Sequence, residues 1–138
     1  MLTISSELID AMVHQARCDY PIETCGLVTR HAHTHVHSRL VRLTNAAVSS
    51  DEFHVASSEQ LAVWREMESR DEEVAVLFHS HTESPAFPSR ADIDRAGEPG
   101  AHYLIVGIGL SDTAEVRSFR IVNGIVVEET LRIVQASK

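Results

Sequence analysis

A short apolar run, Val74 to Phe78, leads directly into His79-Ser80-His81 and sharply limits the folds open to this chain. A continuous apolar run of this kind is typical of a buried central strand. Two histidines at positions i and i+2 of a strand point to the same side, so their imidazole rings can reach one cation. The end of a buried strand lies where the scaffold meets the surface, and such a position suits a catalytic site.

A third metal ligand is available shortly after the histidine pair. The loop from Thr82 to Pro88 lets the chain reverse, and Ser89 can then cap a helix that carries Asp92 in its first turn. The helix dipole favours a carboxylate there, and we expect Asp92 to face back toward the histidines. Two imidazoles and one carboxylate are a ligand set for catalytic zinc, which keeps its fourth position for water and lowers the pKa of that water to about 7.

Hydrolysis also requires a group that takes a proton from the attacking water and passes it to the leaving amine. A carboxylate that lies beside the metal without binding it can do this. Glu23 stands just before, or at the start of, a strand predicted over residues 25–29, and it is our candidate. Ser89 could donate a hydrogen bond to the oxyanion of the tetrahedral intermediate.

Each of these residues also has an ordinary structural interpretation. A histidine at a strand end is often a hydrogen-bonded surface residue, and Glu23 alone would be a common surface carboxylate. Ser89 could act only as a helix cap, and Asp92 only as a first-turn acid. The joint pattern carries more weight than any single member, and it favours a metal site.

The spacing of this set resembles a known family. His79-Ser80-His81, seven further residues and then Ser89-Arg90-Ala91-Asp92 reproduce the HxH-x7-S-x2-D signature of the JAMM (MPN+) metalloproteases. Residues 21–27, with Glu23 before Cys-Gly, resemble the segment that carries the family's glutamate. Many members have proline directly after the second histidine, whereas Thr82 stands there in this chain. The loop that follows is therefore expected to differ in shape.

The resemblance extends over essentially the full length and implies a role for each motif residue. It implies that His79, His81 and Asp92 bind one Zn²⁺, that Glu23 is the general acid and base, and that Ser89 assists the oxyanion. It also implies an α/β (α+β) fold, the cytidine-deaminase-like MPN fold, in which helices flank a mixed central sheet.

Four further stretches are similar to a bacterial peptidase of the family that acts on a ubiquitin-like sulfur carrier ending in Gly-Gly. The likeness implies that this chain hydrolyses the carrier's C-terminal Gly–Cys amide bond and releases cysteine. Alternatives are a desampylase-like or deubiquitinase-like isopeptidase acting on lysine linkages, a peptidase of small molecules, and a noncatalytic MPN scaffold. The stretches are residues 59–68, 86–92, 101–103 and 118–122.

Hydrophobic periodicity predicts a mixed sheet with about three helices. One helix is expected over residues 5–19, capped by Ser5 or Ser6, and another from about residue 57 to 69, with a capping box formed by Ser57 and Gln60. Asn123-Gly124 predicts a hairpin turn between the last two strands. The predicted strands besides those above cover residues 39–45, 53–55, 102–108, 116–122 and 125–134.

Bulk properties exclude several classes of function. The 138 residues suit one domain, residues 1–138, and the net charge of −8 with scattered basic residues argues against nucleic-acid and anionic-lipid binding. No apolar run approaches the ~20 residues of a membrane span, and no secretion signal is seen. Cys18 and Cys25 form no CxxC, so we expect two buried thiols in a cytoplasmic protein. The oligomeric state stays open, a homodimer included.

Four histidines alternate between His31 and His37. On a strand they would share one face and could form a metal-binding array. Because no acidic or thiol partner completes a catalytic set nearby, we favour a solvated loop or edge strand that is rich in histidine.

Overall fold

A mixed sheet forms the centre of the computed structural model, which describes residues 1–135. The elements are β1 (Leu2–Ser5), α1 (Ser6–Asp19), β2 (Cys25–His31), β3 (His37–Leu43), α2 (Ser57–Ser69), β4 (Glu72–His81), α3 (Arg90–Arg95), β5 (His102–Gly107), β6 (Glu115–Val122), β7 (Ile125–Glu129) and β8 (Leu131–Val134). Residues 136–138, which the predicted domain includes, lie outside the described part.

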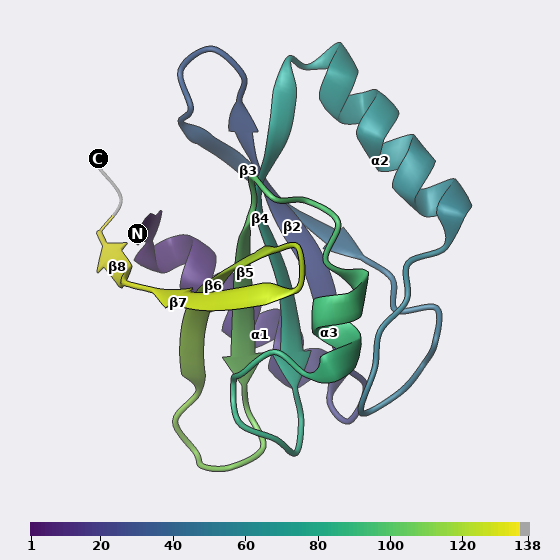
Figure 1. Ribbon diagram of the computed structural model, residues 1–138, viewed down its shortest axis with the longest axis vertical. Coiled ribbons are helices and arrows are strands. Elements are labelled where there is room, and N and C mark those ends of the chain that lie inside the picture. The colour runs from purple at the N-terminus through teal and green to yellow at the C-terminus, as the bar shows by residue number, and fades with distance from the viewer. Residues whose placement is uncertain (136–138) are drawn as a thin grey trace.

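The main sheet has the order β3-β2-β4-β5-β6-β7, in which β4 and β5 are parallel and the other neighbours are antiparallel. A separate two-stranded parallel sheet joins β1 to β8. In Figure 1, α1 lies behind the main sheet and α3 lies in front of it. The predicted fold class, a mixed central sheet flanked by helices, is confirmed.

The two faces of the main sheet bury different sets of apolar side chains. Alternate residues such as Val28, Val76 and Leu104 pack with α1 and with Leu2 and Ile4 of β1. The opposite face of β2 and β4, which presents Leu27 and Leu77, packs against Trp64 and Met67 of α2. Because side chains alternate along a strand, this second face is also the face of His79.

Gly26 lies where β2 packs closely against its neighbouring strands β3 and β4. A Cβ atom placed on this residue would lie 2.5 Å from the Phe78 ring and 2.6 Å from the Val41 carbonyl oxygen. Any larger residue would push β2 away from its neighbours. The glycine of the Cys-Gly pair is therefore required by close packing directly behind the site.

The predicted helices are present, with one error at a cap. Ser5 caps α1 by accepting a hydrogen bond from the Leu8 N–H, as expected. The predicted capping box of Ser57 and Gln60 is wrong, because the N-cap of α2 is Ala56 and no side chain caps it. Ser57 already lies inside the helix, and the first-turn Glu59 instead accepts hydrogen bonds from Thr44.

Two strand predictions are also wrong. Residues 53–55 form no strand but belong to the loop between β3 and α2, where the His54 N–H donates to the Asn45 side chain. The strand expected over residues 125–134 is two strands, because the chain leaves the main sheet after Glu129. The Leu2 N–H then binds the Thr130 carbonyl, and β8 runs parallel to β1.

Solvent exposure tests the predictions made for the two cysteines and for the histidine-rich segment. Cys25 is buried, but the prediction that Cys18 is buried is wrong, since it lies on the outer face of α1 beside His14. His31 ends β2 and His37 begins β3, so the histidines span an exposed turn, as favoured above. No helix within residues 1–135 is long and apolar enough to cross a bilayer.

Candidate metal centre

The pairing of β2 with β4 brings Glu23 to the histidines. Cys25 pairs with His79, and the antiparallel register continues beyond β2, where the Thr24 N–H donates to Ser80 Oγ at 2.8 Å and the Ser80 N–H donates to the Thr24 carbonyl at 3.0 Å. The next position along this register sets Glu23 opposite His81. Residues opposite each other in an antiparallel pair point to the same face, so the Glu23 side chain shares the face of both histidines.

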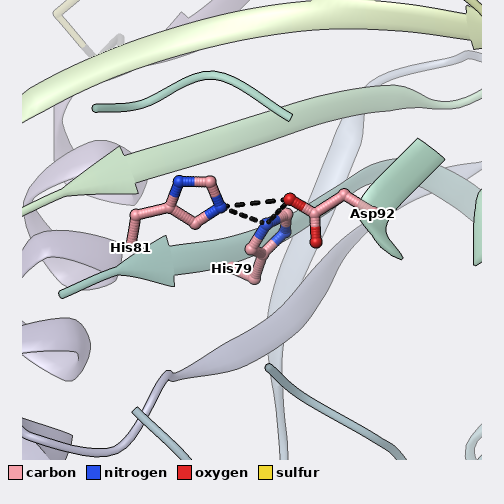
Figure 2. A group of neighbouring side chains, drawn as sticks. All are labelled: His79, His81 and Asp92. Atoms are coloured by element: carbon pink, nitrogen blue, oxygen red, sulfur yellow. Dashed lines mark hydrogen bonds and ion pairs between the residues drawn. The ribbon is translucent and has the colours of Figure 1, made fainter. Parts of the chain in front are cut away.

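The predicted ligands converge on one point. Figure 2 shows the imidazole rings of His79 and His81, on β4, directed toward the Asp92 carboxylate, on α3. The two Nε2 atoms are 3.2 Å apart, and each lies 3.1 Å from Asp92 Oδ2. Ligands at zinc distances of about 2.0–2.1 Å and tetrahedral angles are about 3.3–3.4 Å apart. The spacing therefore fits a zinc-sized ion.

The hydrogen bonding of His81 also fits a metal. Its Nδ1 lies 2.8 Å from the carbonyl oxygen of Pro85, and because a carbonyl can only accept, Nδ1 carries the proton. Nε2 then faces Asp92 Oδ2, and either a proton on Nε2 or a metal cation between the two atoms can stabilise this contact. A histidine that donates its other N–H to a carbonyl is the usual state of a metal ligand.

Asp92 and Ser89 are fixed by a capping box at the start of α3. The Asp92 N–H donates to Ser89 Oγ at 3.1 Å, and the Ser89 N–H donates to Asp92 Oδ2 at 2.9 Å. Because Ser89 Oγ accepts in this bond, its own proton can be donated elsewhere. The sequence predicted this cap, and the helix thus holds Asp92 toward the histidines.

Electrostatics keep Asp92 ionised. Burial alone would raise the pKa of Asp92, but hydrogen bonds from His79 and His81 outweigh it and hold that pKa well below its usual range. Burial likewise lowers the pKa of His81, yet its bonds to Asp92 and to the Pro85 carbonyl raise it overall. A bound cation would take over the role of this imidazolium proton.

Glu23 is buried, with 4% of its surface exposed. Burial raises the pKa of Glu23 to about 8, a charged His81 opposes this rise, and Asp92 adds to it. A carboxyl group whose pKa lies near neutrality can both accept and donate a proton at physiological pH. In a metal-loaded site the positive ion would lower this pKa.

The pKa of Glu23 predicts how the stability of the metal-free protein depends on pH. Between the ordinary pKa of 4.5 and the folded-state value of about 8, only the folded state binds the proton, so stability falls as pH rises through this window. Glu23→Gln removes this loss. In EDTA near pH 8 the variant should exceed wild type by roughly 2 kcal/mol in the free energy of unfolding, and the gap should close near pH 5. Urea unfolding at both pH values measures it, and parallel pH profiles would contradict the assignment.

A second layer of residues around the site was not predicted from the sequence. The Asn45 amide donates to the carbonyls of Glu23 and Glu52 and accepts from the N–H groups of Ala47 and His54. The Phe53 ring stacks on His79 with centroids 4.7 Å apart. The position of Asn45 at the end of a predicted strand was the signal available in the sequence, because asparagine side chains often organise turns.

His102 bonds to Glu129 through Nδ1 and takes no part in the group of three ligands.

A cavity of about 480 Å³ opens beside the candidate ligands, between the sheet, α2 and α3. His79 and Asp92 line one part of it, and Cys25 and Trp64 line another. Pockets of this size hold small ligands or single side chains.

A family comparison decides the class of protein. The profile of the prokaryotic homologs of the JAB domain matches residues 5–122, which is most of the chain. The chain belongs to the prokaryotic JAB family. As a member of this family it is a JAMM-type hydrolase.

Two relatives of this JAB protein have described activities. The CysO-cysteine peptidase of Mycobacterium tuberculosis (strain ATCC 25618 / H37Rv) is 42% identical over 135 residues, which cover 98% of this chain and 92% of the relative. The desampylase of Haloferax volcanii is 27% identical over 109 residues, which cover 75% of this chain and 78% of the relative.

Solved structures of other proteins share the fold. Protein DSY2949 from Desulfitobacterium hafniense superimposes with a TM-score of 0.84 at 28% identity, covering 99% of this chain and 94% of its own. A structure described as a JAMM metalloprotease-like zinc site in the proteasome and signalosome matches at 0.59 and 17% identity, covering 98% and 99%. The second likeness shows the fold alone.

Proposed function

We propose that this protein is a zinc-dependent peptidase that hydrolyses the Gly–Cys amide bond at the C-terminus of a ubiquitin-like sulfur carrier, releasing cysteine and a carrier that ends in Gly-Gly. The observation that carries the proposal is the convergence of His79 Nε2, His81 Nε2 and Asp92 Oδ2 within 3.1–3.2 Å of one another. The 42% identity to a CysO-cysteine peptidase supports the choice of substrate.

His79, His81 and Asp92 would hold the zinc ion. When bound, zinc supplies Lewis acidity, which makes water acidic enough to attack an amide near neutral pH. The Pro85 carbonyl keeps His81 in the tautomer whose Nε2 can ligate. The Ser89 N–H on Asp92 Oδ2 and the stacked Phe53 ring restrict the other two ligands.

Glu23 handles the proton in this proposal. Its carboxylate accepts a proton from the attacking water and donates it to the amine of the departing cysteine. The Glu23 N–H donates to the Ser49 carbonyl, and the Glu23 carbonyl accepts from Asn45, so the backbone on both sides of Glu23 is held before substrate arrives. The Ser89 hydroxyl donates a hydrogen bond to the oxyanion that forms on the glycine carbonyl.

The test is a carrier that ends in Gly-Gly-Cys, incubated with the zinc-loaded protein and analysed by mass spectrometry. We expect loss of one cysteine residue, complete inhibition by a chelator and recovery on adding zinc. A carrier that remains intact under loaded conditions would contradict the proposal.

The second candidate is an isopeptidase that removes a ubiquitin-like modifier from lysine, and the 27% identity to a desampylase favours it. The two candidates differ in the leaving group. Comparing Gly-Cys with Gly-(ε-Lys) linkages on the same carrier separates them, since the proposed enzyme should prefer the first.

Cys18 and Cys25 are free thiols, which fits action in a reducing cytoplasm. Light scattering would determine the oligomeric state, for which the sequence left a homodimer open.

A further inference from the structure

We propose that Arg95 binds the α-carboxylate of the residue that is released, so that the enzyme removes one C-terminal residue rather than cutting within a longer chain. This inference rests on the proposed function, and it assigns the cavity beside the candidate ligands to the leaving residue.

The position of Arg95 brings it to the reacting region. It lies on α3 three residues after Asp92, so both side chains belong to the same helix face. Both line the 480 Å³ cavity, which also contacts His79. A ligand group bound by Arg95 would therefore share one cavity with two of the three candidate metal ligands.

The cavity has an arginine in a mostly apolar wall. Among the described residues that line it, Arg95 is the one arginine or lysine, Asp92 and Glu98 are the acids, and most of the rest of the wall is apolar. Leu43, Trp64 and Ile121 are examples of this apolar wall. A cation at the edge of an apolar cavity matches a ligand with a carboxylate and a small uncharged side chain.

The guanidinium of Arg95 is held in place but keeps donors to spare. It donates to the Phe53 carbonyl, and the Phe53 ring stacks on His79. Its contact with Glu52 is 3.6 Å, between two half-exposed side chains, and such pairs are weak. A guanidinium has five N–H donors and binds carboxylates with two of them at once, so a substrate carboxylate can compete with Glu52.

The two sides of the scissile bond differ in chemistry, and only one fits this cavity. The carrier side ends in glycines, which have neither side chain nor charge and need only a narrow channel. The leaving side is a cysteine with a thiol side chain and a free α-carboxylate. An apolar cavity with one arginine is complementary to the leaving side.

Substrate specificity follows from this assignment. A lysine in an isopeptide linkage would place its side-chain methylenes in the cavity, and its α-carboxylate would be bound in a further peptide bond. Arg95 would then lack its anionic partner, and an unpaired charge next to a substrate amide lowers affinity. Arg95 is therefore a specificity-determining residue that favours a single C-terminal amino acid.

The test compares two substrates, a carrier ending in Gly-Gly-Cys with a free carboxylate and the same carrier with a C-terminal amide. Wild type should cleave the free acid with kcat/KM about 10- to 100-fold higher than the amide. Arg95→Ala should lose this preference by slowing the acid alone, and Arg95→Lys should restore part of it. Equal rates for acid and amide in wild type, or equal slowing of both in Arg95→Ala, would overturn the proposal.

Arg90→Ala is the matched control, because Arg90 lies on the same helix but its side chain is 90% exposed and, within residues 1–135, pairs only with Asp94 at 3.5 Å. It should keep the preference for the acid, and a loss of preference in this variant as well would assign the effect to general charge and overturn the role of Arg95. Thermal unfolding of each variant checks that α3 remains folded.

A binding measurement keeps this inference separate from the proposed peptidase activity. S-methyl-L-cysteine and S-methyl-L-cysteine amide are titrated into the metal-free protein and followed by NMR. Wild type should bind the acid more tightly than the amide, whereas Arg95→Ala should bind the acid and the amide with equal affinity. Such binding without carrier cleavage would reject the proposed function and retain the carboxylate site, whereas equal binding to wild type would reject the carboxylate site itself.

Discussion

Glu23→Gln will hydrolyse a carrier–cysteine substrate about 10²- to 10⁴-fold more slowly than wild type, while it binds zinc as well as wild type does. The amide has nearly the shape of the protonated carboxyl but cannot accept a proton from water. Glu23 is buried, and the continued β2–β4 register sets it opposite His81, so a base from solvent cannot easily replace its carboxylate. Turnover by mass spectrometry and zinc content by elemental analysis measure the two parts of the prediction.

The control for this variant is Glu83→Gln, an exposed acid in the loop that follows His81. It should retain wild-type kcat/KM, because its charge is solvated. Wild-type rates in Glu23→Gln would reject Glu23 as the proton carrier, and loss of zinc from that variant would instead identify it as a ligand.

Removing one metal ligand should have the second large effect. His81→Ala or Asp92→Ala should lose more than about 100-fold in zinc affinity, because only two donors remain of a set that fits the ion. Zinc at a thousand times its Kd stabilises the loaded protein by about 4 kcal/mol, which corresponds to roughly 10–15 °C in Tm at this chain length. Neither variant should show this rise in Tm, and neither should turn over substrate.

His33→Ala is the matched histidine control for the ligand variants. His33 lies in the exposed turn between β2 and β3. The variant should keep the full zinc-dependent rise in Tm, measured by differential scanning fluorimetry with and without EDTA. If His33→Ala lost it and His81→Ala did not, the stabilising zinc would lie in the histidine-rich turn.

The sequence was most informative where a residue's role follows from local geometry. The alternation of a strand puts His79 and His81 on one side, and a serine cap puts Asp92 in the first turn of α3, so the three could be expected together. The apolar run of β4 and the Asn123-Gly124 turn likewise predicted their elements. The spacing of the motif supplied Glu23, which local patterns alone could not place beside the histidines.

The sequence was less informative where partners come from distant segments. Residues 125–134 have the pattern of one strand, and only the pairing of β8 with β1 explains why the chain leaves the sheet. Residues 53–55 are apolar enough for a strand, yet Phe53 packs on His79 and Asn45 holds His54. The carbonyl of Pro85, which selects the tautomer of His81, is invisible in a sequence because every residue has one.

The parallel pair of β1 and β8 affects how this protein forms during translation. In the described chain β1 is bonded to β8 alone, and nearly all of residues 1–135 separates the two strands. Leu2 and Ile4 of β1 are buried in the core beneath α1. A nascent chain therefore carries these apolar residues on an unpaired strand until β8 has emerged from the ribosome. Completion of that part of the core therefore waits for β8, and during this period the chain depends most on chaperones.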